Sequence, residues 1–260
     1  MNRMPMMVLE GDPEEARDAA YACLDAMDAA PPSERPALAL KAIRADATLL
    51  DGYLAAADVA PPGTTEAATA WLAARELARR EAGARLDADH GVLWSNLHAR
   101  PYLRACAGYA ACCFDRREYE AAIAQCRRLL ILDAFDPLEA APLLGACLIL
   151  AGDLAGFEAL RAHCADDDRP QWLYVDAFHA ATTRLPARVR NARIDRAIKS
   201  NRYVPGGLLS APSDADGVEY YAPGSGEEAL VIVASRPGRL WRMRPGALGV
   251  LTRRVSARRD

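Results

Sequence analysis

The spacing of three helix endings constrains the fold of this chain more than any other feature of its sequence. Three segments that read as the last turn of a helix finish at Asp46, Asp133 and Asn201. Asp and Asn at such places cap the next helix or form the turn that leads to it. Asp133 and Asn201 are 68 residues apart, twice 34, and the midpoint, Asp167, follows another helical ending. A period of 34 residues is typical of stacked helix–turn–helix units, so the sequence predicts an all-α repeat protein.

Composition and capping residues also favour helices. The 260 residues include 55 Ala but 4 Phe, which favours close-packed helices over β-sheet. Asp12-Pro13-Glu14-Glu15 and Asp136-Pro137-Leu138-Glu139 each offer a capping Asp and a Pro at the first helical position. Leu230 to Ala234 suits a strand equally well, but a capping box from Ser225 to Glu228 precedes it, so we expect a helix there. The expected helices cover residues 13–29, 34–45, 48–58, 65–84, 101–114, 118–132, 137–150, 154–164, 170–183, 187–199, 226–235 and 245–255.

The spacing and the charge together predict the domain organisation. We expect an N-terminal tail over residues 1–12 and a helical repeat domain over 13–200. Asp46 and Asp133 are more than two periods apart, so we expect an insertion at about 65–100 within that domain. Residues 201–260 are expected to form a capping segment. The net charge of the chain is -3, but residues 181–260 hold 15 Lys and Arg against 7 Asp and Glu, so the C-terminal part is basic.

The unit from Pro101 to Asp133 carries the clearest family signal. Its segments Tyr119-Glu120-Ala121-Ala122-Ile123 and Leu130-Ile131-Leu132-Asp133 resemble the tetratricopeptide repeat (TPR) pattern. That resemblance implies a TPR-like right-handed α-solenoid of antiparallel helix pairs, here with an inserted helix and a C-terminal capping segment.

A second resemblance covers the chain from about residue 35. The segment from Trp94 to Ala105 (WSNLHARPYLRA) is similar to the W-x-x-L-E-T-R-P-Y-M-R-A motif of a TPR-like subgroup of bacteria and plants. The subgroup's three later motifs follow in order at residues 201–209, 220–225 and 241–248. His98-Ala99 replaces Glu-Thr, and Ala222 replaces Ser, so any ligand contact of the subgroup's Glu is altered here. The resemblance implies a helical scaffold for protein contacts.

Arg100 and Arg104 are candidate partner contacts, because they lie one helical turn apart and each offers a planar fork of donors for a carboxylate or phosphate. Trp94 is a candidate aromatic anchor. The alternative is that Arg100 pairs internally with an acidic residue while Trp94 and Tyr102 pack the insertion onto the repeats. On the solenoid hypothesis the first-helix faces line a concave groove. The expected partner-binding residues are Trp94, His98, Arg100, Tyr102, Arg104, Ala107, Ala111 and Phe114.

The basic C-terminal segment supports an alternative function. Arg side chains interleaved with an aromatic ring can hold phosphates and stack on bases. An anionic partner would therefore contact Arg236, Arg239, Arg242 and Arg244 around Trp241. Against this, the apolar Leu248, Val250 and Leu251 favour a capping helix.

Signals for catalysis, metals and membranes are missing from the sequence. The chain has no phosphate-binding, zinc-protease or nucleophile-elbow motif. Its seven cysteines lack paired zinc-ligand spacing, and we expect reduced thiols, with Cys106, Cys113, Cys126 and Cys147 on apolar faces. We expect no catalytic residue, cofactor or metal, and a cytoplasmic protein without a membrane span. The leading hypothesis is an interaction scaffold for a protein or peptide partner; the alternatives are a nucleic-acid accessory protein and an enzyme on a helical scaffold.

Overall fold

The structure is a computed structural model that describes residues 12–88, 91–210, 215, 218 and 220–257. Regular structure in these residues is helical throughout and includes no β-strand, which confirms the all-α class. None of the helices in this part of the chain has the length and apolar character needed to cross a bilayer. The chain divides into two compact units, residues 1–116 and 117–260. That division falls inside the segment expected as one repeat domain, and nearly all of the expected N-terminal tail lies outside the described residues.

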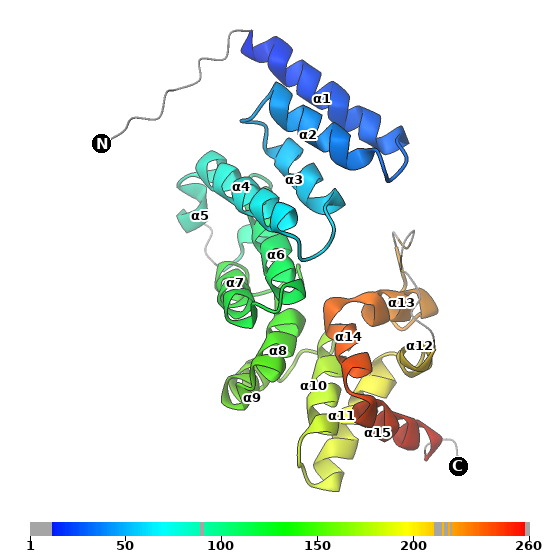
Figure 1. The fold of residues 1–260 in the computed structure, drawn as a ribbon. Coiled ribbons are helices and arrows are strands. Elements are labelled where there is room, and N and C mark those ends of the chain that lie inside the picture. The colour runs from blue at the N-terminus through cyan, green and yellow to red at the C-terminus, as the bar shows by residue number, and fades with distance from the viewer. Residues whose placement is uncertain (1–11, 89–90, 211–214, 216–217, 219, 258–260) are drawn as a thin grey trace. The chain divides into compact units, whose positions relative to one another are not determined.

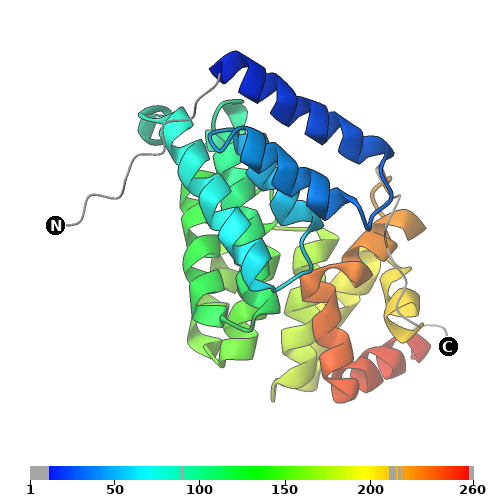
Figure 2. The same cartoon turned by 45° about the horizontal axis from the view of Figure 1, so that its top comes forward.

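The N-terminal unit is a succession of helices in which neighbours along the chain pack together (Figures 1 and 2). Contacts join α1 to α2, α2 to α3, α3 to α4, and α4 to α6. The expected insertion at 65–100 corresponds to α4, a short α5 and a 3-10 turn, η1. The elements are α1 (Pro13–Ala29), α2 (Arg35–Ala45), α3 (Leu50–Val59), α4 (Thr65–Ala82), α5 (Arg85–Ala88), η1 (Leu93–Ser95) and α6 (Arg100–Asp115).

The C-terminal unit includes residues 201–260, the part of the chain expected to form a capping segment. Helices α14 and α15 pack on α10, α15 also contacts α11, and α12 packs on α13 and α15 (Figure 1). Residues Leu230 to Ala234 are helical, as expected from the capping box. The elements are α7 (Tyr119–Leu132), α8 (Ala140–Ala151), α9 (Leu154–His163), α10 (Pro170–Thr182), α11 (Ala187–Ser200), α12 (Val204–Leu209), α13 (Gly226–Ala234), α14 (Arg236–Met243) and α15 (Pro245–Ser256).

Aromatic side chains form the core of the C-terminal unit. Trp241 is buried, its indole N–H donates to the Tyr174 carbonyl at 3.2 Å, and its ring meets Phe178 edge-on at 5.4 Å. Phe157 is also fully buried and packs near Trp172, next to Gly145 of α8, where a Cβ would lie 3.1 to 3.3 Å from these two rings. A large ring in α9 is therefore accommodated by a glycine opposite it.

The same turn recurs at the helix ends that the sequence singled out. The side-chain oxygens of Asp46, Asp133 and Asn201 accept from the backbone N–H two residues later, at 2.8, 3.1 and 2.9 Å. Asp167 accepts from the Arg169 N–H in the same way, at 3.0 Å. The expectation that these residues form turns is confirmed. In the C-terminal unit this turn therefore repeats every 34 residues, at 133, 167 and 201.

One predicted helix start is wrong. Asp12 and Ser225 cap α1 and α13 as expected, but α8 begins at Ala140 and not at Pro137. Asp136 and Glu139 both have positive φ, 50° and 55°, which are not helical values. The Asp136 carboxylate instead accepts from the N–H groups of Ala140 and Ala141 and is paired with Arg169 at 3.1 Å. Glu139, and not Asp136, is therefore the N-cap residue of α8, although the Asp136 side chain satisfies the first N–H groups of the helix from across a turn of three residues.

Candidate functional site

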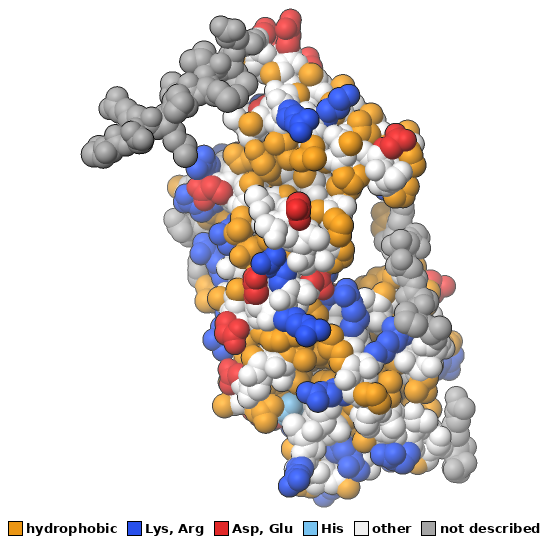
Figure 3. Space-filling view, viewed as in Figure 1, with side chains coloured by type: hydrophobic (Ala, Val, Ile, Leu, Met, Phe, Trp, Pro, Cys, Tyr) orange, Lys and Arg blue, Asp and Glu red, His pale blue; other side chains and the backbone are white. Residues whose placement is uncertain are grey.

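An apolar groove in the N-terminal unit is the candidate site. Its volume is about 500 Å³, within the range of roughly 300–1,000 Å³ that ligand-binding clefts span. Figure 3 shows hydrophobic side chains gathered over α2 and α3. The groove is lined by Pro36, Leu40, Ile43, Tyr53, Ala56, Val59, Ala60, Pro61, Thr65, Glu66, Thr69 and Ala70.

Helical spacing places the apolar residues of α2 on one wall. Pro36, Leu40 and Ile43 follow one another after four and three residues, so they share a face of the helix. Leu40 is 51% exposed, although it is apolar and lies in the middle of the helix. An exposed leucine alone needs no explanation, but one within a contiguous apolar groove marks a surface that another molecule can cover.

Helix α3 forms the facing wall at close range. Gly52 approaches α2 so closely that a Cβ on it would lie 3.3 Å from the Ile43 side chain. Tyr53 and Ala56 lie three residues apart on the groove face, and the Tyr53 hydroxyl donates to the Ala47 carbonyl at 3.2 Å. The ring is therefore tethered at its polar end and presents its apolar face to the groove.

The described lining of the groove carries little charge. Among the described lining residues, Glu66 in the first turn of α4 is the one charged side chain. Arg44 lies one turn beyond Leu40 on α2, is exposed, and forms no ion pair within the described part of the chain. The buried centre of a protein–protein interface is likewise depleted of charged residues.

Arg100 and Trp94 contact each other. The Arg100 Nε donates to the Trp94 carbonyl at 2.8 Å, and the guanidinium lies 5.0 Å from the centre of the Trp94 ring. Arg100 thus has an internal partner, as the alternative interpretation held, although that partner is a tryptophan and not a carboxylate. The contact ties η1 to the first turn of α6.

The other predicted contacts on and before α6 differ in exposure. His98 and Arg104 are exposed, and Arg104 lies 3.9 Å from Asp58, whose pKa is raised by burial. Ala107 and Ala111 are partly exposed. Tyr102 and Phe114 are 2% and 4% exposed, so in this structure their rings are core and not partner contacts. That correction follows from helix geometry, because α6 buries more than one face.

The C-terminal arginines largely serve the fold. Arg242 donates to the carbonyls of Gly207 and Ser210, at 3.1 and 3.4 Å. Arg236 and Arg239 have interactions of their own. Arg244 is exposed and forms no ion pair among the described residues. Of the four arginines expected at an anionic partner, Arg244 is therefore the one whose guanidinium remains available.

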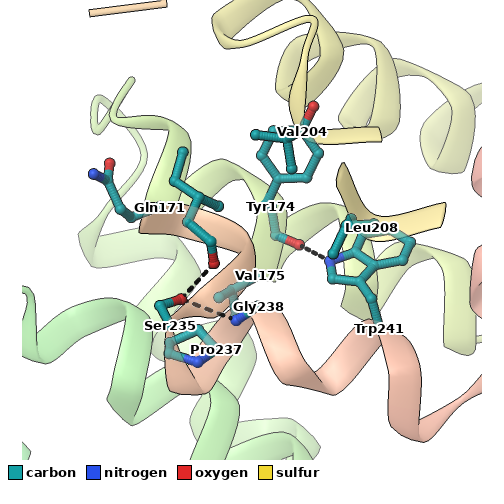
Figure 4. Close-up of a pocket in the computed structure, with 10 residues that line it drawn as sticks. Gln171, Tyr174, Val175, Val204, Leu208, Ser235, Pro237, Gly238 and Trp241 are labelled. Carbon is teal, nitrogen blue, oxygen red and sulfur yellow. Dashed lines mark hydrogen bonds between the residues drawn. The ribbon is translucent and has the colours of Figure 1, made fainter. Parts of the chain in front are cut away.

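The motifs that resemble the TPR-like subgroup also have structural roles. The Asn201 amide donates to the Ser225 carbonyl and to Glu228, both at 2.9 Å, which joins the turn after α11 to the start of α13. Trp241 and its neighbours enclose a cavity of about 10 Å³ beside α10, α12 and α14 (Figure 4). Ser235 at this cavity donates to the Ile232 carbonyl at 2.6 Å and accepts from the Gly238 N–H at 3.1 Å. A space of this size holds about one water molecule and is a packing feature.

Comparisons with models of protein families, with curated proteins and with solved structures find no match. Over the residues that the structure describes, no three His, Cys, Asp or Glu side chains are grouped so that they could hold a metal ion. Cys106, Cys113, Cys126 and Cys147 are buried, which confirms their expected place on apolar faces.

Sequence reasoning missed the groove because its walls come from three helices. The stripe Pro36, Leu40, Ile43 was available as a signal, but in sequence an exposed apolar stripe and a buried one look the same. Only the packing of α2, α3 and α4 distinguishes them.

Proposed function

We propose that this protein is an interaction scaffold that holds an apolar segment of a partner protein in the groove between α2, α3 and α4. The observation that carries the proposal is the groove itself, with its apolar walls, the half-exposed Leu40 and little charge among its described lining residues. Covering the exposed half of the Leu40 side chain contributes on the order of 1 kcal/mol to association.

The partner segment that fits this groove is an amphipathic helix. Its apolar side chains, three and four residues apart, would enter between the stripes of α2 and α3, which is a recurrent mode of peptide recognition. The groove is less suited to a small ligand, because small-molecule sites use several convergent polar groups to fix the orientation of the ligand. Here the Tyr53 hydroxyl is already bonded to Ala47.

We further propose that the helices belong to a TPR-like solenoid of antiparallel pairs. The proposal is supported by the 34-residue recurrence of the turn at Asp133, Asp167 and Asn201, and by the packing of α7 on α8, α8 on α9 and α10 on α11. Solenoids of this kind present extended surfaces to partners.

A comparison of two leucine variants tests the proposed function. Leu40→Glu puts a carboxylate into the groove, whereas Leu97→Glu makes the same change at a site that is 66% exposed and outside the groove. Affinity capture from lysate of the source organism should recover a protein with wild type and Leu97→Glu and lose it with Leu40→Glu. Circular dichroism should show equal helicity for all three. Equal recovery with Leu40→Glu would contradict the proposal.

A further inference from the structure

A second open cavity lies within the C-terminal unit, where α8, α10 and α14 end and α15 begins. Its volume is about 580 Å³. Apolar residues make up most of its lining, and Ile149 and Leu150 are partly exposed there. Leu154 and Met243 also line it and are 47% and 51% exposed. The cavity therefore offers an apolar surface to a molecule that enters from solvent.

The polar groups of α10 that reach this cavity are uncharged or already bonded. The hydroxyls of Thr182 and Thr183 donate to carbonyls in the last turn of the helix, Thr182 to Phe178 at 3.0 Å and Thr183 to His179 at 2.7 Å. These bonds satisfy two of the carbonyl groups at the C-terminal end of α10, where the helix dipole places partial negative charge.

His179 also lines the cavity but adds no charge to it. Its side chain is 4% exposed, and burial lowers its pKa to about 4, so the imidazole is uncharged at neutral pH. Glu158, at 3.7 Å from Nδ1, favours the protonated form, whereas Arg193, at 3.5 Å, and Arg161 oppose it.

Arg244 is the one charged residue among the described residues that line the cavity. Its backbone joins α14 to α15: its N–H donates to the Trp241 carbonyl at 3.4 Å, and its carbonyl accepts from Ala247 at 2.8 Å. Trp241 is itself anchored to Tyr174. The backbone is thus held in place while the guanidinium is exposed and forms no ion pair with the described residues.

We propose that this cavity binds a small amphiphilic carboxylate, with the apolar chain against Ile149, Leu154 and Met243 and the carboxylate on Arg244. The apolar wall accepts the chain. Arginine presents its N–H donors in a fork that matches a carboxylate with two parallel hydrogen bonds. The proposal concerns residues outside the groove between α2, α3 and α4, so the two sites can be tested separately.

Titration calorimetry at pH 7.5 with decanoate, decanol and decyltrimethylammonium, all below micelle formation, tests the proposal on the full chain. We expect decanoate to bind more tightly than the neutral or cationic analogue. Arg244→Gln should weaken decanoate binding about tenfold, because it removes a charge-assisted pair. Leu154→Glu should weaken it further by placing a negative charge among the lining residues. Arg253→Gln makes the matched change at an exposed position of α15 outside the lining, and should leave the affinity within about twofold.

Several results would overturn the proposal. They are no decanoate binding, equal affinity for the three compounds, or equal affinity of wild type and Arg244→Gln when both are folded by circular dichroism. Binding that is lost with Leu40→Glu and kept with Arg244→Gln would place decanoate in the N-terminal groove and would also overturn it.

Discussion

At the scale of single residues, a glycine sets how closely α6 approaches α4. A Cβ at Gly108 would lie 2.5 Å from atoms of the Trp71 ring. Gly108→Ala should therefore displace that ring, and the overpacking outweighs the gain in helix propensity. We expect the free energy of unfolding to fall by about 1–2 kcal/mol, measured by urea denaturation.

Gly206→Ala is the matched control for this prediction. A Cβ at Gly206 of α12 meets no atom within 4 Å, and the residue does not have positive φ. We expect no loss, and a gain of up to about 1 kcal/mol from helix propensity. Equal stability of the two variants would mean that the Trp71 ring is not held against Gly108 in the folded protein.

The second prediction at this scale concerns His179 and pH. Its pKa is lowered to about 4, chiefly by burial, against an ordinary 6.5. Well above pH 6.5 neither the folded nor the unfolded state is protonated, so His179 adds no pH dependence there. Between pH 6.5 and about 4 the unfolded chain takes up a proton that the folded chain does not, and stability falls, by roughly 2 kcal/mol at pH 5.

The measurement compares wild type with His179→Gln, in urea at pH 7.5 and pH 5. The wild type should lose about 2 kcal/mol more than the variant between these two values. Equal losses would mean that His179 is protonated in the folded state as readily as in the unfolded chain.

At the scale of helices and turns, Asn201 has a role that Asp cannot fill. Its oxygen accepts from Tyr203, while its amide donates to Ser225 and to the buried Glu228. Asn201→Asp keeps the acceptor but sets a carboxylate against two acceptors. We expect a loss of about 2–3 kcal/mol at pH 7.

The loss should shrink at low pH, because protonation of the introduced Asp restores a donor. Asn191→Asp is the control, since Asn191 is partly exposed on α11 and accepts from Arg190 at 3.3 Å. It should change stability by no more than about 0.5 kcal/mol. A similar loss for both variants would assign no special role to Asn201.

Most elements follow from local signals, and each exception has a specific physical cause. The recurring turn at Asp46, Asp133 and Asn201 was predictable because a short side chain bonds its own backbone. Helix α14 was missed because Pro237-Gly238 reads as a break, although Pro is tolerated in the first turn, where Ser235 caps the helix. The delayed start of α8 depends on Arg169, 33 residues from Asp136, which a local pattern does not contain.

At the scale of the whole molecule, the candidate site was not predictable from single motifs. The sequence favoured the region around Arg100, and the structure places Tyr102 and Phe114 there in the core. The groove is formed by residues of three successive helices, α2, α3 and α4, which come together only when these helices pack. Likewise, the charge of residues 181–260 suggests an anionic partner, yet Arg242 bonds to backbone carbonyls and Arg254 pairs with Asp195.

Site-specific photo-cross-linking tests the central claim most directly. A benzoylphenylalanine at position 40 would sit in the groove, and the same residue at position 97 would sit on exposed surface outside it. We predict that irradiation in lysate links position 40, but not position 97, to one partner, within a segment whose apolar residues recur every three to four positions. Equal labelling from both positions, or a cross-linked segment without apolar residues, would contradict the claim that the groove binds an amphipathic helix.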